Sequence, residues 1–135
     1  MASLVPKQEK KLTTDAWAAQ TWKVALLLST YTYNHATHST YTSVSGSEVA
    51  GTGYTAGGAT LAGKVSAYVD STTVSLDATD ISWGPGATFA NVRYACSYDT
   101  VTGLIRSIHD IGSAQSVSCG TFNLQWHAYG LVRIA

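Results

Sequence analysis

Residues 81–99, ISWGPGATFANVRYACSYD, carry the clearest structural pattern in this 135-residue sequence. Side chains of a strand point alternately to opposite faces, so from Thr88 onward the even-numbered residues form one apolar face. That face consists of Ala90, Val92, Tyr94, Cys96 and Tyr98. The opposite face is mixed, and Arg93 on it needs water or an acceptor. We therefore expect one long strand in the middle of a β-sheet.

Turn residues stand on both sides of this strand. Gly84-Pro85-Gly86 precedes it, and proline fixes φ while glycine allows backbone conformations that other residues avoid. Residues 100–103 follow it, and a second apolar run comes next at residues 104–108. Two such runs joined by a short polar segment predict an antiparallel hairpin.

The remaining chain reads mainly as short strands. Residues 22–28 are compact and apolar like a buried strand, although a helix segment gives the same pattern. Further strands are expected over 64–69, 73–76, 116–126 and 130–134. Residues 31–44 are expected to form a loop with one helical turn, and the glycine-rich residues 45–58 to form tight turns or a bulge. About eight strands at this spacing predict an all-β fold, a single antiparallel β-sandwich or barrel-like domain over residues 22–135.

Residues 1–21 differ from the rest of the chain. They carry five of the sixteen charged residues and no glycine, and Thr14 is placed to cap a short helix over residues 15–19. Leu4, Val5 and Trp17 are apolar groups with little core of their own. Two interpretations stay open, namely a frayed tail or an N-terminal arm that orders on a neighbouring subunit.

The composition excludes some classes of partner. Lysine plus arginine equals aspartate plus glutamate at eight each, so no basic footprint for nucleic acid or an anionic membrane is present. The apolar run at residues 24–28 is too short for a membrane span, and Lys7, Lys10 and Lys11 are not followed by a secretory apolar stretch, so we expect folding in a cytoplasm.

Only 12% of residues are charged, about half the usual fraction. Such surfaces are common where a protein packs against neighbours, because desolvating hydroxyls and amides costs less than desolvating ions.

No motif predicts bond-making chemistry. His35-x-x-His38 would place two imidazoles on one helical turn, but zinc needs three or four ligands and no second half appears. No nucleophile elbow occurs, and the serines near His109 have no context that singles one out. Asp77 and Asp80 are explained by a turn in which carboxylates bond nearby amides. Because no catalytic, metal-binding or cofactor-binding motif is present, we expect no catalytic residue, no metal site and no cofactor.

The two cysteines are too few for a disulfide scaffold. Cys96 lies on the apolar face of the long strand, which favours a buried free thiol. A Cys96–Cys119 bridge between neighbouring strands is the alternative.

Several tyrosines lie in loops with few charges, namely Tyr31, Tyr33, Tyr41 and Tyr54. Aromatic side chains with a polar tip serve both sugar-binding platforms and protein–protein interfaces. The sequence does not choose between these uses.

Five segments occur in an order that resembles the small virion structural proteins of tailed bacteriophages, which are encoded among head and tail genes. They are WKVALL at 22–27, EVAGTGYTAGG at 48–58, LDATDISW at 76–83, RYA at 93–95 and GTF at 120–122. The similarity covers about residues 22–134, and its most specific part is the E-V-x-G-x-G-Y-x-x-G-G segment. The N-terminal residues 1–21 lie outside it.

The resemblance implies a non-enzymatic part of a virus particle, without catalytic residues. Such proteins include capsid cement (decoration) proteins, so we expect a homotrimer on the capsid surface that bridges subunits of the major capsid protein. The contact candidates are Leu4, Val5, Trp17, Tyr31, Tyr33 and Tyr41. Two alternatives remain, a tail or tail-tip component that contacts host glycan, and a free carbohydrate-binding domain or enzyme.

Overall fold

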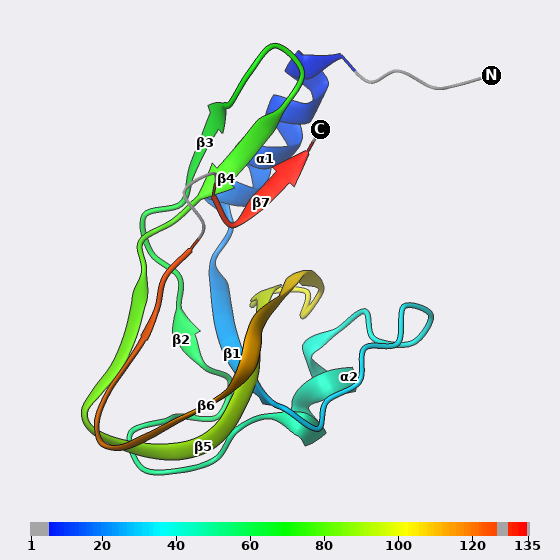
Figure 1. Cartoon of the computed structure of the whole chain (residues 1–135). Helices are drawn as coiled ribbons and strands as arrows, with labels where there is room; N and C mark the ends of the chain where they lie inside the picture. Colours follow the sequence, from blue (N-terminus) through cyan, green and yellow to red (C-terminus); the bar gives the residue numbers. More distant parts are fainter. Residues whose placement is uncertain (1–5, 127–129, 135) are drawn as a thin grey trace. The chain divides into compact units, whose positions relative to one another are not determined.

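The computed structural model describes residues 6–126 and 130–134 (Figure 1). They form a mostly β structure with antiparallel sheets, which confirms the expected fold class at this level. The elements are α1 (Lys7–Ala19), β1 (Trp22–Leu28), α2 (Tyr41–Val44), the 3₁₀ helix η1 (Ser45–Ser47), β2 (Ala59–Thr60), β3 (Val65–Tyr68), β4 (Val74–Asp77), β5 (Ile81–Asp99), β6 (Ile105–Leu124) and β7 (Val132–Ile134).

These elements divide between two compact units. The first unit combines α1, Leu61–Asp80 and β7, and its sheet has the order β3-β4-β7. The second unit comprises Thr21–Thr60 and Ile81–Leu124, and its sheet has the order β2-β1-β5-β6. The described strands therefore form two open sheets, and a single eight-stranded sandwich is not confirmed. The residues expected to make one domain from residue 22 onward are shared between both units.

The predicted hairpin is the main feature of the second unit. β5 pairs with β6 antiparallel, with Cys96 opposite Ile108 and Tyr98 opposite Ile105 (Figure 1). On its other side β5 pairs with β1, where Ala25 lies opposite Cys96. Because neighbouring strands cover both edges of β5, it is the central strand that the sequence predicts.

Two irregularities in β5 change which residues share a face. Gly84-Pro85-Gly86 lies inside β5, where a step of four residues from Trp83 to Ala87 matches a step of two on β6. The predicted turn there is wrong, because the glycines and proline form a bulge. At Asn91, which has φ 61°, a step of three residues from Phe89 to Val92 on β5 matches a step of two on β6. An odd insertion reverses the alternation, so Phe89 and Val92 are both buried and the predicted placement of Ala90 beside Val92 is wrong.

β6 is longer than the sequence predicts. The runs expected at residues 104–108 and 116–126 belong to one strand of 20 residues. Between them the step from Asp110 to Gln115 on β6 faces only the step from Tyr94 to Val92 on β5. The extra residues form a bulge that period-two alternation cannot reveal.

In the first unit the sequence patterns of β3, β4 and β7 are confirmed. β3 pairs antiparallel with β4, and β7 adds to the other edge of β4. Asp70 fixes the turn between β3 and β4, since its Oδ1 accepts hydrogen bonds from the backbone N–H groups of Thr72 and Thr73 at 2.8 Å each. These bonds lower the pKa of Asp70.

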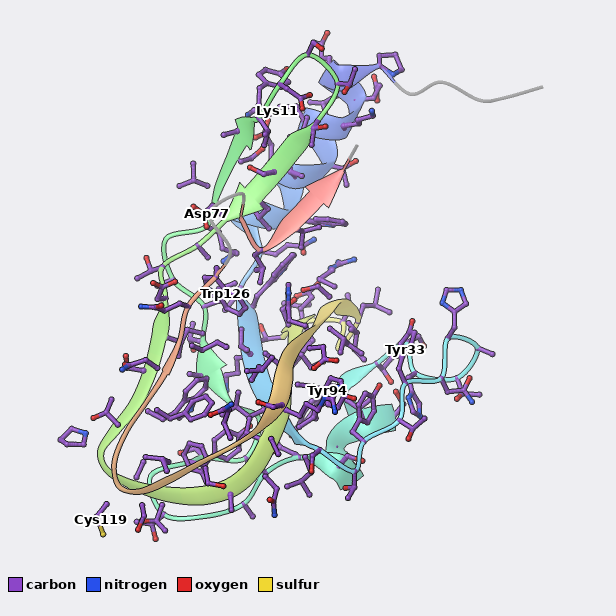
Figure 2. All side chains as sticks on the ribbon, in the orientation of Figure 1. Lys11, Tyr33, Asp77, Tyr94, Cys119 and Trp126 are labelled. Atoms are coloured by element: carbon purple, nitrogen blue, oxygen red, sulfur yellow. The ribbon has the colours of Figure 1, made fainter. Side chains whose placement is uncertain are left out.

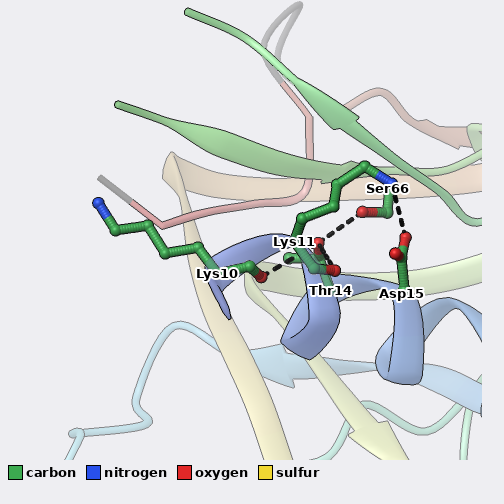
Figure 3. Close-up of polar contacts among 5 residues, drawn as sticks. All are labelled: Lys10, Lys11, Thr14, Asp15 and Ser66. Carbon is green, nitrogen blue, oxygen red and sulfur yellow. Dashed lines mark hydrogen bonds and ion pairs between the residues drawn. The ribbon is translucent and has the colours of Figure 1, made fainter. Parts of the chain in front are cut away.

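The helix α1 differs most from its prediction. It begins at Lys7, so Thr14 lies inside it and the predicted N-cap is wrong. Thr14 is fully buried, and its hydroxyl bonds the carbonyl of Lys11 at 3.1 Å and the hydroxyl of Ser66 on β3 (Figure 3). Lys11 also pairs with Asp15 one turn later at 2.8 Å. Residues 7–19 thus pack on β3 and β4 within the first unit, so a separate N-terminal arm over residues 1–21 is not confirmed.

Candidate functional site

Residues 45–58, the glycine strap, lie against the sheet of the second unit. The Val49 N–H donates to the carbonyl of Leu26, and the Thr88 N–H donates to that of Thr52, both at 2.9 Å. Gly58 has φ +83°, and a Cβ there would lie 1.8 Å from the carbonyl oxygen of Val24. Only glycine permits both this conformation and this approach. The glycines therefore serve close packing as well as the turns that the sequence predicts.

Glu48 closes the strap on itself. Its carboxylate accepts hydrogen bonds from the Tyr41 hydroxyl at 3.0 Å and from the Gly57 N–H at 3.0 Å. The Tyr41 ring stacks on Tyr98 with centroids 4.5 Å apart, and the Tyr98 hydroxyl donates to the Gly57 carbonyl at 2.6 Å. Burial, together with the Glu48 carboxylate, raises the pKa of Tyr41 to about 12. Tyr41 thus holds the strap in place.

Tyr54, in the middle of the strap, is partly buried and packs against the core. Its hydroxyl oxygen accepts the N–H of Leu26 on β1 at 2.9 Å. Its ring contacts Trp83 and Phe89, with centroids 6.2 and 5.8 Å away. Burial raises its pKa. The segment that carries the resemblance to virion proteins is therefore used to build the fold.

The loop of residues 31–39, the aromatic loop, holds tyrosines in two different states. Tyr31 is 4% exposed, its hydroxyl bonds His38 Nδ1 at 3.0 Å, and its ring meets Tyr94 edge-on at 5.5 Å. Tyr33 is 52% exposed. Its ring packs only edge-on against His35 and His38, with centroids 6.1 and 6.4 Å away. Tyr31 anchors the loop, and Tyr33 is presented by it.

A groove of about 700 Å³, the aromatic groove, separates this loop from β5 and β6. Figure 2 labels Tyr33 and Tyr94, which both line it. The lining comprises Tyr33, His35, His38 and Ser39 of the loop, Tyr94 of β5, and residues 104–108 and 110 at the start of β6. All of these belong to the second unit, and the volume lies within the range of roughly 300–1,000 Å³ that small ligands occupy.

Each charged side chain that lines the groove has an opposite charge beside it. Asp110 accepts from Arg93 Nε at 3.0 Å and Nη2 at 3.2 Å, and its Oδ1 also accepts the Gly112 N–H at 2.8 Å. The bonds from Arg93 chiefly lower the pKa of Asp110. Arg106 Nη2 lies 3.6 Å from Asp99 Oδ2. The groove therefore offers polar groups without an unbalanced charge.

Ser107 connects the groove to a chain of polar side chains that no sequence motif marks. Its Oγ lies 2.8 Å from His109 Nε2 and is also bonded to Oγ of the fully buried Ser97 on β5. Burial lowers the pKa of His109. Ser107 and His109 are two residues apart, so their side chains lie on one face of a strand. This spacing is the sequence signal that could have identified the pair. The chain satisfies the hydroxyl of Ser97 across the two strands.

The predicted contact residues do not form one site. Tyr31 and Tyr33 lie together at the aromatic loop, whereas Tyr41 is stacked on Tyr98. Trp17 is half-buried on α1 and belongs to the first unit. Leu4 and Val5 lie outside the described residues. The sequence did not predict that Tyr94 and the start of β6 complete the groove.

Both cysteines are free. Cys96 is fully buried, and burial raises its pKa to about 12, so the favoured interpretation of a buried free thiol is confirmed. Cys119 is exposed. Over residues 6–126 and 130–134, no three histidine, cysteine or acidic side chains converge as metal ligands would.

Comparison with known proteins returns no relative: no family model, no curated protein and no solved structure matches this chain. None of the helices in the part of the chain that the structure describes has the length and apolar character needed to cross a bilayer.

Proposed function

We propose that this chain is a bacteriophage virion structural protein, a capsid cement protein that binds the major capsid protein on the capsid surface as a homotrimer. The resemblance of its five sequence segments supports this role, and so does the low content of charged residues. In this role the protein acts by binding other subunits and catalyses no reaction.

The observation that carries the proposal is the composition of the outer strand of the second unit. β6 is the last strand in the order β2-β1-β5-β6, so one of its edges has no neighbour among the described strands. From Ile111 to Leu124 it carries no charged residue, and residues 112–116 are all exposed. Monomeric proteins commonly protect such edges with lysine, proline or a covering segment. An uncharged exposed edge suits a strand that packs against another subunit.

Cement proteins act by repetition of modest contacts. A standard interface buries about 800 Å² on each partner, and a trimer at a local threefold position would make three such contacts at once. Linked contacts strengthen one another, because the second binding event becomes intramolecular. The summed effect over a shell would help it to resist the pressure of packaged DNA.

The proposal is tested with capsids assembled from the major capsid protein of the phage that encodes this chain. Wild-type protein should co-sediment with expanded capsids and raise their resistance to heat. A double variant, Ser116→Lys and Ser118→Lys, places two charges on exposed positions of β6 and should lose most of this binding.

Val101→Lys is the matched control, because Val101 is 87% exposed in the β5–β6 turn, outside β6. It should bind capsids as the wild type does. Wild-type protein that ignores expanded capsids would contradict the proposal.

The aromatic groove favours a second candidate, a tail or tail-tip component that contacts host glycan. Its exposed Tyr33 and neutral polar lining suit that role. Labelling the protein in intact particles separates the candidates, since the cement protein decorates heads and a tip component is confined to the tail.

A further inference from the structure

We propose that the aromatic groove binds a neutral saccharide, one or a few uncharged sugar units held between Tyr33 and Tyr94. This site goes beyond the proposed cement role, and it does not depend on whether the protein sits on the head or on the tail. The inference rests on three features of the groove: its rings, its donors and acceptors, and its balance of charge.

The two rings provide apolar surfaces that differ in exposure. Tyr94 is held from below by Tyr31, edge-on at 5.5 Å, and Arg93 lies 5.6 Å from its centroid. Tyr33 is half exposed on a loop, with edge-on ring contacts to His35 and His38. The C–H face of a pyranose is apolar and flat, so it packs on aromatic rings while its hydroxyls stay at the rim. A fixed ring opposite an exposed one suits a flat, amphipathic ligand.

His38 supplies a hydrogen-bond donor whose identity follows from its neighbours. Its Nδ1 accepts the backbone N–H of Asn34 at 3.1 Å, and a backbone N–H can only donate. Nδ1 therefore carries its single lone pair, which the Asn34 N–H and the Tyr31 hydroxyl share as donors, and the ring N–H is at Nε2. Since His38 lines the groove, its Nε2–H is a donor for a ligand oxygen.

Asp110 supplies an acceptor on the β6 side. Arg93 and the Gly112 N–H hold its carboxylate in place and leave about one acceptor position unused, because a carboxylate can accept about four hydrogen bonds and three are made. A sugar hydroxyl can donate to this carboxylate and accept from a neighbouring N–H or O–H. Ser107 adds a hydroxyl to the same lining.

The charge balance selects an uncharged ligand. Asp110 is neutralised by Arg93, and Arg106 lies beside Asp99, so a phosphate, a sialic acid or a cation would find no unpaired opposite charge. A purely apolar ligand would cover Asp110 and His38 without pairing their remaining hydrogen-bonding groups, which costs free energy. A neutral saccharide can pack on the two rings and form hydrogen bonds with the polar groups.

The test is saturation-transfer NMR with the full chain and a panel of methyl glycosides of glucose, galactose, mannose and N-acetylglucosamine at millimolar concentrations. N-acetylneuraminic acid and a blocked leucine–valine dipeptide serve as the charged and the apolar probe. At least one neutral glycoside should bind and should shift the resonances of Tyr33 and Tyr94. Tyr33→Ala should weaken that binding about tenfold or more, and Asp110→Asn should weaken it less.

Tyr68→Ala is the matched control, because Tyr68 is 48% exposed but belongs to the first unit. It should bind like the wild type. The proposal is overturned if no neutral glycoside binds, if only the charged or the apolar probe binds, if Tyr33→Ala binds unchanged, or if Tyr68→Ala loses the ligand. Capsid co-sedimentation keeps the two proposals apart, since the double variant Ser116→Lys and Ser118→Lys lies outside the groove and should lose capsid binding while it still binds the glycoside.

Discussion

The glycine strap and the aromatic loop show how the same residue type can serve the fold or a ligand. Both are polar, tyrosine-bearing segments of the second unit, and their tyrosines looked equivalent in the sequence. In the strap Tyr54 is partly buried against the core and its hydroxyl accepts a strand N–H, whereas in the aromatic loop Tyr33 is 52% exposed. A tyrosine in an uncharged segment is therefore no guide to a binding surface by itself.

Glycine explains the difference. In the strap, Gly51 and Gly58 let the backbone approach the sheet so closely that any Cβ would overlap a carbonyl oxygen. That approach brings the Tyr54 side chain against the core. Residues 31–39 contain no glycine, so the aromatic loop cannot pack its backbone on the sheet in this way. It is held instead by Tyr31 and His38, and Tyr33 is left exposed.

The largest effect is expected from Gly58→Ala in the strap. The new Cβ would overlap the Val24 carbonyl, and the φ of +83° is unfavourable for alanine, so the free energy of unfolding should fall by about 3 kcal/mol or more. Denaturant unfolding measures this loss. Gly46→Ala, in the same strap with no atom within 4 Å of the new Cβ, should change stability by less than about 1 kcal/mol. Equal stability of the two variants would show that close packing does not hold the strap.

Glu48→Ala should have the next largest effect. It leaves the Tyr41 hydroxyl and the Gly57 N–H without their acceptor, which costs about 1–3 kcal/mol of stability. Glu48→Gln keeps one carbonyl oxygen as an acceptor, so it should lose less stability than Glu48→Ala. If both variants unfold at the wild-type denaturant concentration, the carboxylate does not close the strap.

The tyrosine comparison is tested directly by removing one hydroxyl from each segment. Tyr54→Phe leaves the buried Leu26 N–H without an acceptor and should cost about 1–3 kcal/mol. Tyr33→Phe removes a hydroxyl at an exposed position and should stay within about 0.5 kcal/mol of the wild type. Thermal unfolding of the two variants in parallel measures the contrast, and a reversed order would refute it.

The smallest effect is a pH dependence at alkaline pH. Tyr41 has its pKa raised from 10.0 to about 12 by burial and by Glu48, so the folded state favours the neutral phenol. The stabilisation is complete below the unfolded pKa of about 10 and is lost as the pH rises through about 12. The ultraviolet titration of wild type minus that of Tyr41→Phe should show one group with a midpoint near 12. A midpoint near 10 would mean that Tyr41 is not held as the structure shows.

Local patterns in the sequence predicted the elements that depend on local chemistry. The apolar run of β1, the β5–β6 hairpin and the bond from the Ala78 N–H to the Asp77 carboxylate follow from burial, alternation and carboxylate–amide bonding. The bulge at Asn91 could not be predicted, because an inserted residue depends on the register of the partner strand. The full helix α1 was missed because its stability comes from packing Thr14 on Ser66, far along the chain.

The candidate site was predicted only in part for the same reason. Tyr31 and Tyr33 were recognised by residue type, whereas Tyr94 was assigned to the core. The groove exists because the hairpin brings Tyr94 and the start of β6 beside the aromatic loop, and no spacing within one segment encodes this. The neutral pairing of Asp110 with Arg93 likewise depends on strands that meet only in the folded unit.

A density map of the intact virion, by cryo-electron microscopy, tests the docking role most directly. We predict density for this chain on the capsid surface, with residues 111–124 of β6 buried against a neighbouring subunit. A particle that lacks the chain, or one in which this uncharged strand faces solvent while other surfaces make the contacts, would contradict the proposal.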